Sequence, residues 1–355
     1  MMTDTLNIQV EKVKKSRLSD LNAEELPFGK VFTDHMLVAE YENGQWQSVK
    51  ILPFGDLSVS PALAALHYGQ AIFEGMKAYK NDKEEVFLFR PKTHYMRLNV
   101  SAQRMAMPEI PEELFMEGIT QLLKLDAAWV PASEGGALYI RPLYISTETS
   151  VGVKISESYK LIIMLSPVGK YYSKPLKVLV EKDYTRAVDG GIGFVKAAGN
   201  YGRSMYPTKI AKEKGYDQLI WTDFATHQYV EESGTMNLMF VINDTLITPK
   251  GGDTILSGVT RDSVLTIARD MEIKVEERKI SIQELIDAVK NGTLQEAFGT
   301  GTAATIAPIK TMGFNGIDYE FPSAENRPIS TRIATELHRI RKNRVADKYA
   351  WMTKI

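Results

Sequence analysis

The residue of this chain with the clearest capacity for chemistry is Lys196, which lies in GGIGFVKAAGNYGRS, residues 190–204. Glycine, alanine and apolar residues surround it, and desolvation disfavours the charged form of an amine, which leaves a nucleophile and a base. Tyr201 follows shortly after, and Glu232 lies in VEESGTMN. A nucleophilic lysine, a phenol and an isolated carboxylate are the groups with which an enzyme holds pyridoxal phosphate. The alternative is that Lys196, like most lysines, is a solvated surface charge.

Two glycine-containing segments further along the chain are suited to binding an anion. In GTGTAA, residues 299–304, backbone N–H groups can face an anion, and Thr300 and Thr302 add hydroxyl groups. In LSGVTRDSV, residues 256–264, Thr260 stands at the start of a predicted helix, where N–H groups without intrahelical partners favour a phosphate. Taken alone, Thr260 is more simply interpreted as an N-cap.

Two nucleotide-binding motifs are approached in this chain, and neither is complete. The segment before Lys196 lacks the Gly-Lys-Ser/Thr ending of a P-loop. The match of GTGTAA to G-x-G-x-x-G/A is followed by Thr-Ile-Ala-Pro, which does not begin a helix. We therefore do not predict a nucleotide site.

Arg141 is a candidate for recognising a substrate carboxylate. It lies in ALYIRPLYI, flanked by apolar residues on a predicted strand and on the same face as Tyr139. A guanidinium buried there requires an anion, and a carboxylate can bind it in a bidentate manner. Arg90 and Arg97 bracket FRPKTHYMRL, and one of them could reach a phosphate.

Composition limits the classes of partner. The 355 residues predict two domains, and a net charge of -1 attracts neither nucleic acid nor anionic lipid. The absence of cysteine excludes disulfides, thiolate zinc sites and cysteine nucleophiles, and fits the cytosol. We find no secretory signal and no apolar run of the roughly 18 residues that a membrane helix needs. His35, His67 and His94 lack metal-ligand spacing, so we interpret them as structural and expect no metal. The expected partners are small molecules and copies of the chain itself, in the cytoplasm.

The elements that position these residues are hairpins and interspersed helices. Asn43-Gly44 predicts a hairpin between residues 35–41 and 46–54, and a second hairpin is expected around Asn81-Asp82. Other predicted strands are 136–146, 159–167, 175–182, 216–224, 235–242, 244–249 and 294–309, and the predicted helices are one beginning at Pro61 and those at 93–107, 111–129, 202–214, 259–271, 281–292 and 329–343. Without a steady β-α-β alternation, this order favours an α+β fold.

A domain boundary is predicted at SPVGKYYSKP, residues 166–175, which interrupts the pattern with prolines, a glycine and tyrosines. We expect a smaller α/β domain at 1–166, a linker at 167–176 and a larger, cofactor-binding α/β domain at 177–355.

Seven motifs in order and register identify a resemblance to a known family. They are FTDHMLVAEY, LHYGQAIFEGMKAY, FRPKTHYMRL, ALYIRPLYI, GGIGFVKAAGNY, EESGTMNLMFV and FGTGTAATIAP. The chain resembles the branched-chain amino acid aminotransferases, which are fold type IV pyridoxal-phosphate enzymes, from about Phe28 to the last helix. The resemblance implies a two-domain α+β architecture with pyridoxal 5′-phosphate as cofactor.

The resemblance also implies roles for individual residues. Lys196 would be the Schiff-base lysine and then the base that moves the proton between substrate and cofactor. Tyr201 would bond the phenolic oxygen of the cofactor, and Glu232 would pair with its pyridine nitrogen. The cofactor phosphate would be held by Arg97, Thr260, Thr302 and backbone N–H groups near Val259.

Substrate contacts are implied in the same way. Carboxylates would be received by Tyr139, Arg141 and the backbone at Thr302 and Ala303. An apolar pocket would be lined by Phe28, Tyr68, Phe73 and Tyr171. Tyr68, Val151 and Val153 would reach the site of a neighbouring subunit, which implies a homodimer or a higher oligomer.

The implied reaction transfers the amino group of leucine, isoleucine or valine to 2-oxoglutarate by a ping-pong path. Two departures from the family pattern stand out. Ala304 to Ala307 stand where vertebrate members have a Cys-x-x-Cys pair, and ISTETSVGV, residues 145–153, lacks a glycine that the family often has before the acidic position of this segment. A D-amino-acid aminotransferase and an aminodeoxychorismate lyase share the lysine, tyrosine and glutamate, but TMN after Glu232 and the arginine of YIRP argue against both. A non-catalytic dimeric paralogue is a further alternative, against which the intact Lys196 argues.

Overall fold

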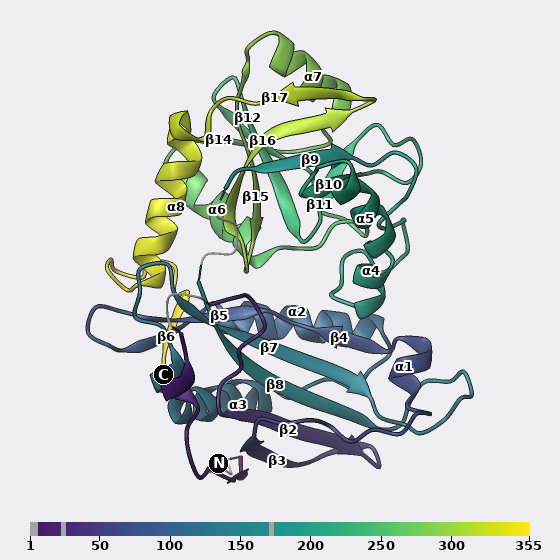
Figure 1. Ribbon diagram of the computed structural model, residues 1–355, viewed down its shortest axis with the longest axis vertical. Helices are drawn as coiled ribbons and strands as arrows, with labels where there is room; N and C mark the ends of the chain where they lie inside the picture. The colour runs from purple at the N-terminus through teal and green to yellow at the C-terminus, as the bar shows by residue number, and fades with distance from the viewer. Residues whose placement is uncertain (1–5, 23–25, 170–173) are drawn as a thin grey trace. The chain divides into compact units, whose positions relative to one another are not determined.

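The computed structural model describes residues 6–22, 26–169 and 174–355 (Figure 1). Its contacts divide the chain into two compact units, which we call the first and the second unit. The first unit is Met1–Tyr171 with Lys196–Gly199 and Ile340–Ile355, and the second is Tyr172–Val195 with Asn200–Arg339. The ranges expected from the sequence follow chain order, whereas the first unit also takes up two segments from beyond the linker.

The first unit is built on a sheet in the order β1-β3-β2-β8-β7-β5-β6-β18, with β4 paired to β7. Its strands are β1 (Ile8–Val10), β2 (His35–Glu42), β3 (Gln45–Pro53), β4 (Ala71–Phe73), β5 (Met76–Lys80), β6 (Val86–Phe89), β7 (Ala137–Ser146), β8 (Tyr159–Val168) and β18 (Met352–Lys354). Both predicted hairpins are present, and Asn43 and Gly44 turn the first one with φ angles of 53° and 77°. Strand β8 lies inside the sheet between β2 and β7, as its apolar run predicts.

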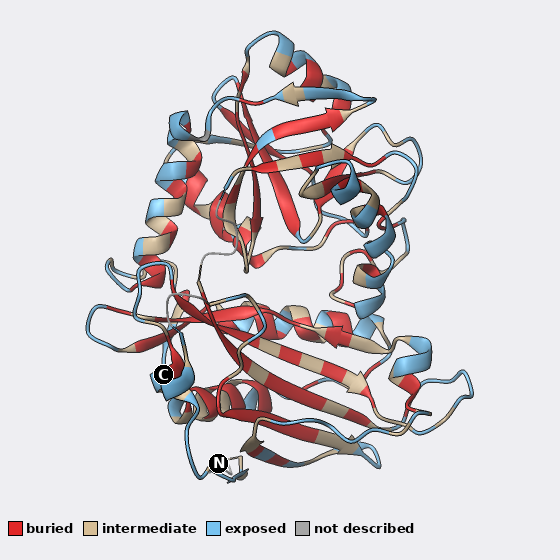
Figure 2. Cartoon of the chain, viewed as in Figure 1, coloured by how far each residue is buried: buried red, intermediate tan, exposed pale blue. Residues whose placement is uncertain are grey.

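The helices of the first unit are α1 (Ala64–Tyr68), α2 (Pro91–Arg104) and α3 (Glu112–Leu125), with short 3₁₀ turns at Leu18–Asp20 and Ala127–Trp129. Helix α3 buries Leu114, Phe115, Ile119, Leu122 and Leu123, whose spacing forms one apolar stripe. Figure 2 shows the same contrast across the chain, with buried residues concentrated on strands and exposed ones on loops and outer helix faces.

The second unit contains the sheet β11-β10-β9-β16-β15-β12-β13-β14, with β17 paired to β16. Its strands are β9 (Leu176–Val180), β10 (Gln218–Thr222), β11 (Val230–Ser233), β12 (Met236–Ile242), β13 (Thr245–Thr248), β14 (Lys274–Glu277), β15 (Leu294–Gly301), β16 (Thr305–Phe314) and β17 (Ile317–Glu320). Because β11 pairs with both β10 and β12, part of this sheet closes into a ring.

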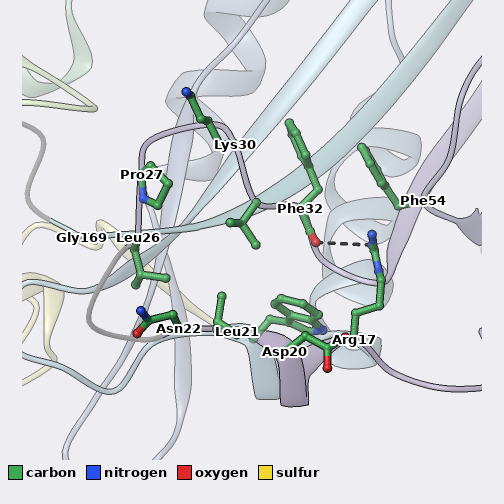
Figure 3. A pocket seen from close by; sticks show the side chains of 12 residues that line it. Arg17, Asp20, Leu21, Asn22, Leu26, Pro27, Lys30, Phe32, Phe54 and Gly169 are labelled. Atoms are coloured by element: carbon green, nitrogen blue, oxygen red, sulfur yellow. Dashed lines mark hydrogen bonds between the residues drawn. The ribbon is translucent and has the colours of Figure 1, made fainter.

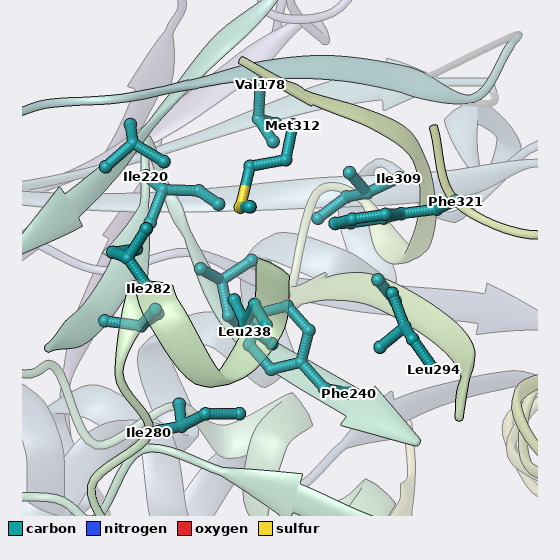
Figure 4. Close-up of a cluster of buried hydrophobic side chains, with 14 of the residues drawn as sticks. Val178, Ile220, Leu238, Phe240, Ile280, Ile282, Leu294, Ile309, Met312 and Phe321 are labelled. Atoms are coloured by element: carbon teal, nitrogen blue, oxygen red, sulfur yellow. The ribbon is translucent and has the colours of Figure 1, made fainter. Parts of the chain in front are cut away.

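The hydrophobic core of the second unit is formed mainly by side chains of this sheet. Figure 4 shows the cluster, in which Val178, Ile220, Leu238 and Ile309 converge from different strands. Burial of so many branched side chains supplies the main driving force for the fold, at roughly 1.5–3 kcal/mol for each fully buried residue.

The helices of the second unit are the last part of α4 (Ala198–Gly202), α5 (Met205–Glu213), α6 (Val259–Asp270), α7 (Ile282–Lys290) and most of α8 (Pro328–Arg341). Helix α7 begins with a capping interaction, in which Ser281 accepts a hydrogen bond from the Glu284 N–H at 3.0 Å. The helix predicted at 202–214 is present as α5, which begins only at Met205, because Ser204 turns the chain after α4 and donates to the Tyr201 carbonyl. The α+β prediction is confirmed.

Candidate active site

Lys196 is held through its backbone by two elements of the first unit. Its N–H donates to the Ser101 hydroxyl on α2 at 3.1 Å, and its carbonyl accepts from the Phe73 N–H on β4 at 3.1 Å. The following residue, Ala197, bridges to Ile72. These contacts are made by backbone atoms and fix the position of Lys196 in the first unit.

The ring of Phe73 lies beside two cations. The Lys196 Nζ is 4.8 Å from the ring centroid, and the Arg141 Cζ is 4.6 Å from it. The negative face of an aromatic ring attracts both charges. The first unit thus brings together a primary amine and a guanidinium.

Tyr139 extends this group of residues. Its hydroxyl accepts a hydrogen bond from Arg141 Nη2 at 3.0 Å, and its ring meets that of Phe28 edge-on at a centroid distance of 4.8 Å. The tyrosine hydroxyl lies so close to Gly75 that a Cβ there would collide with it, so only glycine fits. The Arg141 Nε is buried and has no hydrogen-bond partner among the described residues.

Arg97 forms a buried network that the sequence did not reveal. Its Nε and Nη2 donate to Glu74 at 2.5 and 2.9 Å, and the ring nitrogen Nδ1 of His94 lies 2.8 Å from the same carboxylate. Burial alone would raise the pKa of Glu74, but the charge of Arg97 and the contact with His94 lower that pKa far below its usual range. The only sequence signal for Glu74 is a carboxylate between apolar residues in AIFEGM.

The residues expected at a neighbouring subunit are on the surface of the first unit. Tyr68, Val151 and Val153 are exposed by 44%, 66% and 83%. The Tyr68 hydroxyl donates to the Val151 carbonyl, so these side chains belong to one region. Tyr171, expected in the apolar pocket, lies outside the described residues.

In the second unit, Glu232, Asn237 and Thr300 form a row across three strands. Glu232 on β11 pairs with Asn237 on β12, which pairs in turn with Thr300 on β15. Directly paired residues project to the same face of a sheet. The buried Thr300 Oγ1 has no hydrogen-bond partner among the described residues, so the row has unsatisfied hydrogen-bonding capacity.

The N-terminus of α6 lies next to this row. Gly258 is its N-cap, and a Cβ at Gly258 would collide with the Asn237 Oδ1. Thr260 is inside the first turn and buried, so the simpler interpretation of Thr260 as the N-cap is wrong. The first turn of α6, which contains Val259 and Thr260, provides the positive end of a helix dipole, which favours an anion.

The remaining predicted cofactor residues lie on a turn and on a helix. Thr302 and Ala303 form the half-buried turn between β15 and β16, which excludes the helix that a dinucleotide fingerprint requires. Tyr201 is half-buried on α4, the short helix that begins two residues after Lys196.

Glu232 is not the isolated carboxylate that the sequence suggests. The Arg186 Nε lies 2.6 Å from Glu232 Oε1, and the Leu256 N–H donates to Oε2 at 3.1 Å. The neighbouring Glu231 is also buried, and burial, reinforced by the charge of Glu232, raises the pKa of Glu231 to about 7. Sequence reasoning missed Arg186 because nothing in DYTRAVDG marks a buried arginine.

The described residues fit pyridoxal phosphate. The 12-residue helix α6 offers its N-terminus to a phosphate. The Thr300 hydroxyl, which has no hydrogen-bond partner within the described ranges, lies on the same sheet face as Glu232. The ion-paired Glu232 suits a protonated pyridine nitrogen. In the first unit, Lys196 has a primary amine, the group that pyridoxal phosphate requires.

Other features of the first unit do not coincide with these residues. A hollow of about 880 Å³ is lined by Arg17, Leu21, Phe32, Phe54 and Trp129, among others, and contains no predicted site residue (Figure 3).

Within the described ranges, no helix is long and apolar enough to cross a membrane. The same residues contain no group of three or more metal-ligating side chains placed to hold an ion.

Comparisons with known proteins agree with this chemistry. Residues 71–312 match the family "Amino-transferase class IV". The chain is 43% identical to branched-chain-amino-acid aminotransferase 2 of Bacillus subtilis (strain 168), over 100% of this chain and 98% of that one. A crystal structure of a branched-chain aminotransferase from Thermoproteus uzoniensis with norvaline matches with a TM-score of 0.74 and 27% identity, covering 90% of this chain and 99% of that one.

A third comparison concerns the cofactor. The crystal structure of the T.th. branched-chain amino acid aminotransferase with pyridoxamine 5′-phosphate matches with a TM-score of 0.72 and 26% identity, covering 89% of this chain and 97% of that one. The chain is thus a class IV aminotransferase, and within that class it belongs to the branched-chain amino acid aminotransferases. Its cofactor is pyridoxal 5′-phosphate.

Proposed function

We propose that this chain transfers the amino group of leucine, isoleucine or valine to 2-oxoglutarate, and catalyses the reverse reaction, by a ping-pong path. The observation that carries the proposal is the shared contact of Lys196 and Arg141 with Phe73. One cation beside the ring serves as the reacting amine, and the other is a guanidinium able to bind the second carboxylate of glutamate. Apolar walls suffice for the branched side chains.

The residues act in the following way in this proposal. The cofactor, when bound, supplies an electron sink for the substrate carbanion. Lys196 would bind the cofactor through its amine and would move the proton at the substrate Cα. Glu232 holds a proton on the pyridine nitrogen, and Tyr201 bonds the phenolic oxygen. The phosphate is held by Arg97, Val259, Thr260 and Thr302.

The substrate is oriented by polar groups and an apolar lining. Tyr139, Arg141 and the backbone at Thr302 and Ala303 receive carboxylates. The apolar lining consists of Phe28, Tyr68, Phe73 and Tyr171. Of these residues, Arg141 discriminates between substrates, because only the dicarboxylate places a charged side chain in the pocket.

A substrate panel tests the proposal. The purified chain with pyridoxal phosphate and 2-oxoglutarate should produce glutamate from L-leucine, L-isoleucine and L-valine, and not from D-alanine. Preference for D-alanine would instead identify a D-amino-acid aminotransferase. Cofactor binding without turnover of any donor would support the non-catalytic scaffold.

Replacing Glu232 with Gln should reduce turnover more than cofactor affinity. The substitution removes the charge that keeps the pyridine nitrogen protonated, while the phosphate contacts remain. A charge-assisted hydrogen bond contributes roughly 1.5–3 kcal/mol, so we expect kcat to fall about 10- to 100-fold.

Glu231→Gln is the matched control for this substitution, because Glu231 is the adjacent residue on β11 and projects to the opposite side of the strand. Its turnover should stay within about threefold of wild type, an order-of-magnitude bound from the weaker effect of groups outside the site. Steady-state kinetics and cofactor titration distinguish the two variants. Wild-type turnover in Glu232→Gln would assign Glu232 a structural role only.

The proposal includes self-association as a homodimer or higher oligomer in the cytoplasm. Leu66, Tyr68, Val151, Val153 and Ile155 leave large apolar side chains exposed on the first unit. Apolar patches of this kind mark protein interfaces, and a second copy would cover them. The cytoplasmic location is the one expected from a cysteine-free sequence. A net charge of -1 gives no attraction to nucleic acid or membranes, so the proposal includes neither.

A further inference from the structure

We propose that Arg186 is a positioning residue that keeps Glu232 charged and fixes it relative to the segments before Lys196 and before α6. The inference rests on the proposed function, because it concerns the carboxylate that faces the pyridine nitrogen. Arg186 is 5% exposed, and its Nε lies 2.6 Å from Glu232 Oε1.

The other nitrogens of Arg186 bind backbone carbonyls. Nη1 donates to the Thr254 carbonyl at 2.9 Å, and Nη2 donates to the Gly193 carbonyl at 3.2 Å. A guanidinium is planar and rigid, so three contacts in different directions fix its orientation. Lysine, with a compact ammonium on a flexible stem, cannot reproduce all three.

The two carbonyls belong to segments that carry cofactor residues. Gly193 lies three residues before Lys196 in the chain. A Cβ at Gly193 would be 2.5 Å from the Ala187 Cβ and 2.7 Å from the Asp253 carbonyl oxygen. Only glycine fits here, because the backbone at residue 193 lies directly against Ala187 and Asp253 of the second unit. Thr254 precedes Leu256, whose N–H donates to Glu232, and precedes the N-terminus of α6. Arg186 therefore connects the carboxylate to both segments.

The charge of Arg186 also decides where a proton resides. A buried carboxylate without a cation beside it takes up a proton. Glu232 is buried and is preceded in the chain by a second buried carboxyl group, Glu231, and a neighbouring like charge also favours the protonated form. Arg186 places its positive charge against Glu232 and makes this carboxylate a weaker base. Without that charge, Glu232 competes with the pyridine nitrogen for their shared proton.

The test compares Arg186→Gln with Arg186→Lys. Gln keeps a donor for a carbonyl and loses the charge, whereas Lys keeps the charge and loses the fork geometry. The readout is ¹⁵N NMR of pyridoxal phosphate labelled at the ring nitrogen and bound to each full-length variant. We expect an unprotonated nitrogen in Arg186→Gln and a protonated one in wild type and Arg186→Lys.

Turnover provides a second measurement. Arg186→Gln should lower kcat about 10- to 100-fold, as Glu232→Gln does, and should cost less than about twofold when added to Glu232→Gln, since residues that act as a unit are not additive. Arg327→Gln is the control, because Arg327 is equally buried in the second unit but donates to the carbonyls of Ala297 and Ile309. The nitrogen should stay protonated in this control.

The outcomes separate this inference from the proposed function. If wild type binds the cofactor and transaminates but Arg186→Gln keeps a protonated nitrogen, the inference fails alone. A nitrogen that loses its proton equally in the Gln, Lys and Arg327 variants would also overturn it, because general destabilisation would then explain the change. If wild type itself does not transaminate, the proposed function fails.

Discussion

Replacing Lys196 with Ala should abolish transamination while leaving the chain folded. In the proposed reaction the amine acts both as nucleophile and as base. General base catalysis alone contributes up to roughly 10⁴-fold, so we expect activity to fall by at least about that factor. The fold should persist because the contacts of Lys196 with Ser101 and Phe73 are made by backbone atoms, which alanine retains.

The measurement is turnover of L-leucine with 2-oxoglutarate, together with thermal unfolding and cofactor titration. The variant should bind pyridoxal phosphate reversibly through the remaining contacts. Lys209→Ala is the matched control, because Lys209 is an exposed lysine on α5 and should show wild-type turnover. Turnover above a trace in a folded Lys196→Ala variant would remove this lysine from the chemistry.

The part of the site that local sequence could predict is the part carried by short motifs. Lys196 could be proposed as a catalytic candidate because a lysine among glycine and apolar residues is unfavourable without a function. The groups that hold it were not recognisable. Ser101 and Lys196 are separated by 95 positions, and only the packing of α2 in the first unit makes them neighbours.

The electrostatic environment of Glu232 was also beyond local prediction. The sequence shows two adjacent glutamates in VEES and does not show which cation faces them. Arg186 reaches Glu232 from a loop outside regular secondary structure, where residue spacing has no periodicity to interpret. The Arg97–Glu74 pair was missed because its members come from different parts of the chain, and only the fold brings them together.

The fold shows the same division between local and long-range information. Asn43-Gly44 predicted its hairpin, because this turn type requires positive φ at both positions. The closed ring of strands depends on pairings such as that of Leu176 with Ile309, which no local pattern specifies. The short strands β14, β17 and β18 were not predicted, since three or four residues carry little periodicity.

Arg141→Met should separate the two substrates of the proposed reaction. Methionine keeps most of the apolar bulk and removes the charge that glutamate and 2-oxoglutarate require. Leaving a charged hydrogen-bond partner unpaired costs on the order of a hundredfold, so we expect kcat/KM for glutamate to fall by about that factor. Leucine should be affected much less, because its methyl groups need only a dry surface.

Arg344→Met is the matched control for this substitution. Arg344 belongs to the same unit but pairs with Asp82 and Glu134 at the surface. Exposed pairs of this kind contribute about 0–1 kcal/mol, so both substrates should react as they do with wild type.

Single-turnover mixing of wild type and Arg141→Met with leucine alone and with glutamate alone tests the central claim that one site serves both substrates. Each half-reaction is followed by the absorbance of the bound cofactor. Wild type should convert fully with either amino acid, and Arg141→Met should remain close to wild type with leucine while becoming about a hundredfold less efficient with glutamate. An equal loss with both would mean that Arg141 binds the α-carboxylate common to them or supports β7, and would contradict the dual-substrate account.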